Sequence, residues 1–234
     1  MKSFFYQSPN GYCYNSDTLF LFDFILNFKL KGKILDVGTG VGVLPVLIAK
    51  YFNVKLYAVE VQDIMYRYAK KNFEINSVEV NLFLTDFLEF KTENRFDFIV
   101  SNPPFYKVDK HKSPNKSLAI ARYEEFLPLE KFIKKVSSLL TPRGYFIFCY
   151  DASYIDEILE LLRVNKIKPE FIKFVHPKAN SEANLVMITS RKSSRSVCKI
   201  LPPLIVFDSN NNYTQEARDI FFKTNTHSFK AFYD

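Results

Sequence analysis

The fold is decided by residues 33–42, which read Lys-Ile-Leu-Asp-Val-Gly-Thr-Gly-Val-Gly. The apolar run from Lys33 to Val37 predicts a buried strand. The three glycines that follow allow the backbone to turn sharply and to approach a ligand closely. Helical spacing then runs from Val41 to Phe52. A strand, a glycine turn and a helix in this order predict the first unit of an α/β domain.

The rest of the chain repeats this alternation of short apolar runs and helical patterns. We expect further strands at residues 55–61, 80–85, 96–101, 145–150, 170–175 and 184–190, and further helices at residues 62–76, 124–140 and 153–164, with a turn at residues 141–144. Right-handed crossovers place helices on both faces of a parallel sheet. The last two strands are joined by a loop alone, so one of them is antiparallel. We therefore predict an α/β, Rossmann-like domain with a seven-stranded, mostly parallel sheet and one antiparallel strand.

Composition fits one domain. The chain has 234 residues, of which 47% are hydrophobic, enough for a single core. We expect residues 1–32 to form an N-terminal cover segment and residues 33–234 to form the domain. No run of 18 apolar residues predicts a membrane span, and the first residues lack a secretory pattern. The cysteines, Cys13, Cys149 and Cys198, are odd in number and widely spaced, which is typical of a reduced cytoplasmic protein without a metal site.

Acidic residues follow the glycine turn at two further strand ends. Glu60 ends the second strand, where a carboxylate can accept hydrogen bonds from both ribose hydroxyls of a nucleotide-like ligand. Asp86 ends the third strand and could accept from an adenine amino group. A dinucleotide site is a weaker interpretation, because the third spaced glycine is missing and Leu44 and Pro45 stand after the turn. No phosphate-binding Gly-x-x-x-x-Gly-Lys-Ser/Thr loop supports nucleotide hydrolysis.

A second motif, Asn102-Pro103-Pro104-Phe105, follows the strand predicted at residues 96–101. An exocyclic amine is a poor nucleophile because its lone pair is delocalised. The Asn102 side-chain oxygen and the Pro103 carbonyl can each accept a hydrogen bond from such an amine, which favours a pyramidal nitrogen. Phe105 offers a ring face on which a flat base can stack. The motif therefore predicts methylation of a planar amine, driven mostly by positioning.

Together the two motifs resemble the class I methyltransferases that use S-adenosylmethionine. The resemblance implies that Gly38, Gly40 and Gly42 line the methionine part of the cofactor, with Asp36 near its amino group. It also implies that Glu60 binds the ribose and Asp86 the adenine. The Asn-Pro-Pro-Phe motif alone leaves three kinds of substrate open: adenine N6 in DNA or RNA, guanine N2 in ribosomal RNA, and glutamine in release factors.

The flanking sequence is similar to the bacterial tRNA adenine-N6 methyltransferases, which modify the adenine 3′ of the anticodon in a valine tRNA. The resemblance covers nearly the whole chain. The matching segments are Gln7-Ser8-Pro9, Tyr14, Asp17, Leu19, Leu21, Ala121-Arg122-Tyr123-Glu124, His176-Pro177-Lys178, Ala183-Asn184, Leu201-Pro202-Pro203-Leu204-Ile205-Val206 and Tyr213-Thr214. The chain departs from the family at Thr18-Leu19-Phe20-Leu21, where smaller residues are more frequent, and at Phe105, where Tyr is frequent.

Charge agrees with an RNA partner. The formal net charge is +7, which favours a polyanionic ligand. Two basic runs are candidates for phosphate contacts. The first holds Lys107, Lys110, Lys112, Lys116 and Arg122, opposed by Asp109, and the second holds Arg191, Lys192, Arg195 and Lys199. Arg122 is expected to order the substrate loop, and Asp17 to close over the cofactor or to pair with a helix end.

Two other functions remain open from the sequence. A protein glutamine methyltransferase usually carries a helical domain before the fold, whereas 32 residues precede the first core strand here. An RNA-binding domain without catalysis would not need Asp36, Glu60 and Asn102 together. The leading hypothesis is an S-adenosylmethionine-dependent tRNA adenine-N6 methyltransferase, without a metal, acting as a monomer or a homodimer.

Overall fold

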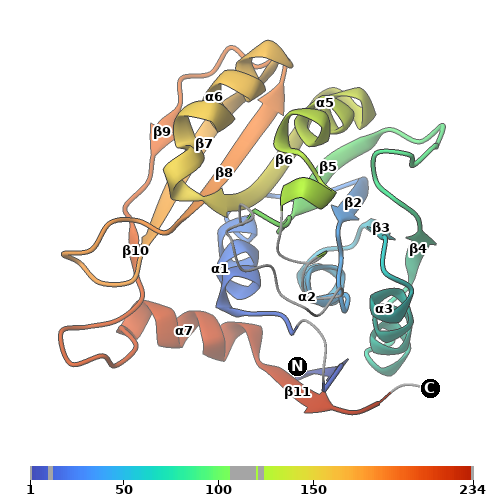
Figure 1. Ribbon diagram of the computed structural model, residues 1–234, viewed down its shortest axis with the longest axis horizontal. Helices are drawn as coiled ribbons and strands as arrows, with labels where there is room; N and C mark the ends of the chain where they lie inside the picture. The colour runs from blue at the N-terminus through green and yellow to red at the C-terminus, as the bar shows by residue number, and fades with distance from the viewer. Residues whose placement is uncertain (1, 10–12, 106–119, 121–123, 233–234) are drawn as a thin grey trace.

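The computed structural model describes residues 2–9, 13–105, 120 and 124–232 (Figure 1). Its centre is a sheet of nine strands in the spatial order β10-β7-β8-β6-β5-β2-β3-β4, with β9 paired to β7. The strands are β2 (Lys33–Val37), β3 (Lys55–Glu60), β4 (Val80–Leu84), β5 (Phe96–Ser101), β6 (Leu140–Asp151), β7 (Ile167–His176), β8 (Leu185–Lys192), β9 (Lys199–Ile200) and β10 (Leu204–Ile205).

Strand direction agrees with the prediction of one antiparallel strand. β8 runs antiparallel to both β6 and β7, and every other pair in the sheet is parallel. The strand count differs from the expected seven. The two additional strands, β9 and β10, have two residues each and pair with β7, and runs this short carry no period that a sequence could reveal.

Helices cover both faces of the sheet. Figure 1 shows α5 and α6 above the sheet and α1, α2, α3 and α7 below it. The helices are α1 (Ser16–Ile25), α2 (Val43–Tyr51), α3 (Asp63–Ile75), α5 (Leu129–Leu139), α6 (Ile155–Val164) and α7 (Gln215–Thr224), with 3₁₀ turns η1 (Glu124–Phe126) and η2 (Ala152–Tyr154). The sequence predicted α2, α3 and α6 to within a few residues, and no helix was predicted for α1 or α7.

The helix expected at residues 124–140 begins later. Only a 3₁₀ turn forms at its start, and α5 begins at Leu129. Pro128 explains the difference, because proline disfavours helical geometry in the residue before it. The turn expected at residues 141–144 lies inside β6, where Arg143 has φ +64° and the register against β5 shifts. The strand thus passes through an irregularity instead of starting after it.

The two ends of the described chain lie together. β1 (Ser3–Gln7) and β11 (Thr226–Lys230) form a parallel two-stranded ribbon. Asn72, fully buried in α3, accepts from the Tyr6 N–H at 2.7 Å and donates to the Tyr6 and Val41 carbonyls at 3.0 and 2.8 Å. One side chain therefore joins the ribbon, α3 and the glycine turn.

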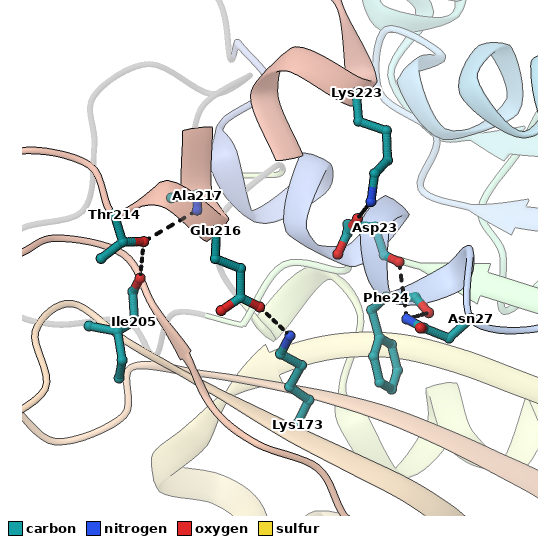
Figure 2. Close-up of polar contacts among 9 residues, drawn as sticks. All are labelled: Asp23, Phe24, Asn27, Lys173, Ile205, Thr214, Glu216, Ala217 and Lys223. Carbon is teal, nitrogen blue, oxygen red and sulfur yellow. Dashed lines mark hydrogen bonds and ion pairs between the residues drawn. The ribbon is translucent and has the colours of Figure 1, made fainter. Parts of the chain in front are cut away.

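Helix α7 is joined to α1 on one side and to the sheet on the other, as Figure 2 shows. Lys223 pairs with Asp23 of α1, and Glu216 pairs with Lys173 of β7 at 2.8 Å. The Thr214 hydroxyl caps the helix by accepting from the Ala217 N–H and also donates to the Ile205 carbonyl at 2.6 Å. The C-terminal residues therefore hold α1 against the core.

Candidate active site

A cavity of about 560 Å³ opens at the carboxyl ends of β2, β3 and β5. In open parallel sheets this edge is where ligands bind. The lining residues come from five parts of the chain: residues 13–18, 36–44, 59–65, 85–87 and 102–105, with contributions from Ile120, Phe126 and Leu127. Both sequence motifs therefore face one cavity.

The glycine turn forms a wall of this cavity together with Glu60. Gly38, Gly40 and Gly42 have φ values of +69°, +56° and +85°, a region that glycine enters without strain. A Cβ atom at Gly38 or Gly40 would meet nothing within 4 Å, whereas one at Gly42 would lie 2.5 Å from the Phe73 ring. Gly38 and Gly40 line the cavity and Gly42 does not. Contrary to the expected placement, Gly42 packs against α3.

Asp36 lies at the base of this wall. It is buried, and its Oδ2 atom accepts no hydrogen bond from the residues that the structure describes. Burial, with a smaller contribution from Glu60, raises the pKa of Asp36 to about 7, against the lowering effect of the Thr39 hydroxyl. A buried carboxylate oxygen with spare acceptor capacity is costly in the absence of a donor. Asp36 is therefore suited to receive a cationic amino group from a ligand.

Glu60 fixes the wall through backbone contacts. Its Oε2 accepts from the Gly40 N–H at 2.8 Å, and its Oε1 accepts from the Val61 and Gln62 N–H groups at 3.0 and 2.9 Å. Burial raises the pKa of Glu60, and these three hydrogen bonds oppose the rise. A carboxylate has about four acceptor positions, so one remains for a ligand hydroxyl. We call Asp36 to Val41 together with Glu60 to Gln62 the cofactor wall.

Asp86 and Asp17 also line the cavity. Asp86 is exposed, lines the cavity, and accepts from the Leu88 N–H at 2.7 Å, which closes the turn after β4. Asp17 lies in the first turn of α1 and accepts from the Asn15 amide at 2.8 Å. Burial raises the pKa of Asp17, and the bond from Asn15 opposes the rise. Both carboxylates therefore face the cavity with one oxygen already engaged.

Asn102 stands directly after β5 and lines the cavity beside the start of the glycine turn, because Ser101 pairs with Val37 of β2. Its Nδ2 donates to the Thr18 hydroxyl at 3.0 Å, and its Oδ1 accepts from the Cys149 thiol at 3.1 Å. Pro103 to Phe105 continue the lining, and the Phe105 ring, 8% exposed, packs against Tyr150 with centroids 5.5 Å apart. We call Asn102 to Phe105 with Thr18 and Cys149 the Asn102 corner. The sequence did not reveal Thr18 and Cys149, because they lie 84 and 47 positions away.

The two basic runs have different outcomes. Lys107, Lys110, Lys112, Lys116 and Arg122, with Asp109, lie outside the described residues. In the second run, Arg191 pairs with the buried Glu170 at 2.8 Å, and Lys192 donates to the Ser137 and Leu140 carbonyls at 2.6 and 3.3 Å. These two charges are bound within the fold and hold β8 in place, and their contact with phosphate stays a prediction. Arg195 and Lys199 are exposed.

The cavity fits S-adenosylmethionine by the chemistry of its walls. Asp36 offers an ammonium group a buried oxygen that is unpaired among the described residues, and Glu60 keeps an acceptor for a hydroxyl. Gly38 and Gly40 leave open space where a side chain would stand. Among the described residues, no cluster of His, Cys, Asp and Glu could hold a metal ion. No helix in the described part of the chain is long and apolar enough to cross a membrane.

Comparison with known proteins places this geometry in a family. The profile of the family described as "Methyltransferase small domain" matches residues 15–149. A tRNA1(Val) (adenine(37)-N6)-methyltransferase of Phocaeicola vulgatus is 30% identical over 186 residues, which is 79% of this chain and 78% of the relative. The enzyme of the same name from Christiangramia forsetii is 29% identical over 197 residues, 80% of each chain.

Solved structures show the same fold at low identity. A predicted O-methyltransferase from Agrobacterium tumefaciens superposes with a TM-score of 0.69 at 16% identity, covering 92% of this chain and 100% of that one. A 16S rRNA N2 G1207 methyltransferase from T. thermophilus, in complex with AdoMet and guanosine, has a TM-score of 0.56 at 20% identity and covers 79% and 45% of the two chains. These likenesses concern the fold alone.

Proposed function

The chain belongs to the methyltransferase small domain family and, within it, to the tRNA1(Val) (adenine(37)-N6)-methyltransferases, and we propose that it methylates the exocyclic N6 of an adenine in tRNA. S-adenosylmethionine is the methyl donor. The target we propose is adenine 37 of tRNA1(Val), as the relatives' names state for those proteins. We further propose that the enzyme works in the cytoplasm, as a monomer or a homodimer.

One observation carries the proposal: Asn102 and the cofactor wall line the same cavity. Amine methylation needs a donor and an amine-gripping group at one place. Asp36 and Glu60 supply contacts suited to an amino acid and a ribose, and Asn102 and Pro103 supply acceptors suited to an amine. A binding domain without catalysis has no need for both sets of contacts in one cavity.

We assign the following roles to the chain's own residues. When bound, S-adenosylmethionine supplies an activated methyl group. Asp36 holds its amino group, Glu60 its ribose and Asp86 its adenine, while Gly38 and Gly40 give it room. Asp17 closes over the cofactor. Gly42 shapes the turn and does not contact the cofactor.

The Asn102 corner acts on the amine. Asn102 Oδ1 and the Pro103 carbonyl accept hydrogen bonds from the exocyclic N–H groups, so that the nitrogen lone pair turns toward the methyl group. Phe105 presents a ring to the target base, as aromatic side chains do for extruded bases. Methyl transfer leaves the amine nitrogen positively charged, and the nitrogen then releases one proton to water, so no general base is required. Positioning in a partly buried site supplies most of the acceleration.

The direct test is a methylation reaction with defined substrates. Purified protein is incubated with an unmodified tRNA1(Val) transcript and deuterium-labelled S-adenosylmethionine, and the digested nucleosides are examined by mass spectrometry. We expect labelled N6-methyladenosine, and none from a transcript in which adenine 37 is replaced by guanine. Ribosomal RNA and a release factor are tested in parallel. Labelled N2-methylguanosine or methylglutamine, without N6-methyladenosine in tRNA, would overturn the proposal.

A further inference from the structure

The side-chain amide of Asn102 is held at both ends by residues from other parts of the chain. Thr18 comes from α1, and Cys149 comes from β6, the strand next to β5. Neither belongs to the cofactor wall or to the Asn-Pro-Pro-Phe motif. Their contacts therefore affect the orientation of the Asn102 amide, which is the group proposed to bind the substrate amine.

Cys149 can serve this contact as a donor. The residue is fully buried, and burial, with a smaller effect from Asp17, raises the pKa of its thiol well above the usual value. The sulfur therefore keeps its proton at physiological pH. A thiol is a weak donor and a weak acceptor, but a donated hydrogen bond is the contact that suits an amide oxygen. The Asn102 oxygen accordingly faces Cys149.

Thr18 completes the arrangement from the opposite side. It is buried in the first turn of α1, and its hydroxyl accepts from Asn102 Nδ2 at 3.0 Å. An amide rotated by 180° would replace the N–H···O bond to Thr18 and would direct its NH₂ group at the Cys149 sulfur, which is only a weak acceptor. The two contacts thus hold the Asn102 amide at both its oxygen end and its nitrogen end.

The position of Thr18 depends on the C-terminal part of the chain. α1 is joined to α7 by the Lys223–Asp23 pair, and α7 is joined to β7 by the Glu216–Lys173 pair (Figure 2). The Thr18 hydroxyl therefore sits on a helix whose position is fixed by ion pairs made away from the cavity. A contact built on fixed elements can set the geometry of a site closely.

We propose that Thr18 and Cys149 are positioning residues that fix the amide orientation of Asn102 and so set the rate of methyl transfer. An amide oxygen has two lone pairs. One accepts from Cys149, and the second is aimed at the amine. The inference rests on the proposed function, because it assigns these residues to the rate of that reaction.

The rate test uses two pairs of variants. Thr18→Val and Cys149→Ala remove one contact each, whereas Thr18→Ser and Cys149→Ser keep a hydroxyl that can make it. We expect the removing variants to lower kcat about tenfold or more, since small misplacements of reacting groups carry penalties up to about 100-fold. The serine variants should stay within about threefold of the wild type. KM for tRNA and Kd for S-adenosylmethionine should change less than about twofold, because the two contacts position Asn102 for the transition state and do not bind either substrate.

Thr189→Val is the matched control. Thr189 is buried in β8, and its hydroxyl makes no hydrogen bond with the described residues. The substitution is chemically the same as Thr18→Val but does not touch Asn102, so kcat should not change. Equal losses in Thr18→Val and Thr189→Val, losses that follow Tm alone, or unchanged kcat in both removing variants would overturn the proposal.

A spectroscopic measurement separates this inference from the proposed function. The infrared S–H band of Cys149 is identified by its absence in Cys149→Ser. A hydrogen bond to Asn102 lowers that stretching frequency, so the band should move to higher frequency in Asn102→Ala. A band that does not move removes the contact and with it the inference. If the band moves but tRNA is not methylated, the orientation of Asn102 stands and the proposed substrate fails.

Discussion

The cofactor wall and the Asn102 corner lie in one cavity but are built in different ways. The wall comes from two short stretches of chain, and its central carboxylate, Glu60, binds backbone N–H groups of Gly40, Val61 and Gln62. The Asn102 corner is held by side chains from α1 and β6. The wall is thus set by local backbone geometry, and the corner by packing between distant elements.

This difference explains why the sequence could reveal the residues of the cofactor wall but not the partners of Asn102. A glycine turn and a strand-end carboxylate are readable because their residues are adjacent or one β-α unit apart. The partners of Asn102 are readable only once α1 and β6 are placed beside β5. Substitutions in the wall should therefore act on stability and cofactor affinity, and those in the corner on rate.

The largest expected effect is the change in folding stability with pH that Asp36 causes. Its pKa is about 7 in the folded protein against 3.8 as the ordinary value, so between these values the folded state binds the extra proton. The stabilisation that this proton gives the folded state is present in full below pH 3.8 and is lost as pH rises through 7. The free energy of unfolding then falls by about 4 kcal/mol for this one group. Urea unfolding at several pH values should show this slope, and Asp36→Asn should remove it. If both proteins keep the same slope, Asp36 does not cause it.

The affinity of the wall for S-adenosylmethionine should change with pH in the opposite direction. Ionised Asp36 attracts the ammonium group, whereas the protonated form does not. Affinity should therefore fall as pH is lowered through 7, as measured by calorimetry. A pH-independent Kd in the wild type would remove Asp36 from cofactor binding.

Next in size is the effect of an added methyl group in the glycine turn. In Gly42→Ala the new Cβ combines a φ of +85° with a position 2.5 Å from the Phe73 ring. Backbone strain and overpacking together should lower the free energy of unfolding by about 3 kcal/mol. Gly38→Ala, with φ +69° and open space around the Cβ, should cost about 1 kcal/mol by strain alone. Equal losses in urea unfolding would show that contact with α3 does not matter.

The smallest expected effect concerns the lysines that follow the Asn102 corner in the sequence. Changing Lys107, Lys110 and Lys112 together to Ala should raise the KM for tRNA about tenfold and reduce the slope of log K against log salt by about 2 to 3, if each lysine contacts one phosphate. The control changes Lys29, Lys31 and Lys55, which are exposed at the opposite end of the sheet strands from the cavity. An equal change in the control would assign the effect to net charge.

Much of the fold was predictable because its core strands are short apolar runs with clear boundaries. β2 and β5 were predicted at the residues where they form, since a glycine turn and a proline motif end them. Three features were not predictable. Helix α1 is apolar on nearly all sides and carries little helical period, Pro128 delays α5, and the β1–β11 ribbon pairs residues from the two ends of the described chain.

The candidate site shows the same limit at the level of side chains. Positive charge at Arg191 and Lys192 indicated phosphate contacts, yet Glu170 and two backbone carbonyls bind those charges within the fold. Charge is visible in a sequence, but its partners are not. Gly42 likewise belongs to the motif but faces Phe73 instead of the cavity.

The division of the cavity into two halves is tested most directly by measuring Kd for S-adenosylmethionine and the single-turnover methylation rate in three proteins: the wild type, Asn102→Ala and Glu60→Gln. Asn102→Ala should lower the rate on the order of 1000-fold while Kd stays within a few-fold. Glu60→Gln should raise Kd about tenfold or more, because a charge-assisted backbone contact is lost. If Asn102→Ala keeps its rate, or loses cofactor binding as fully as Glu60→Gln, the cavity is not divided into a cofactor-binding half and a half that sets the rate.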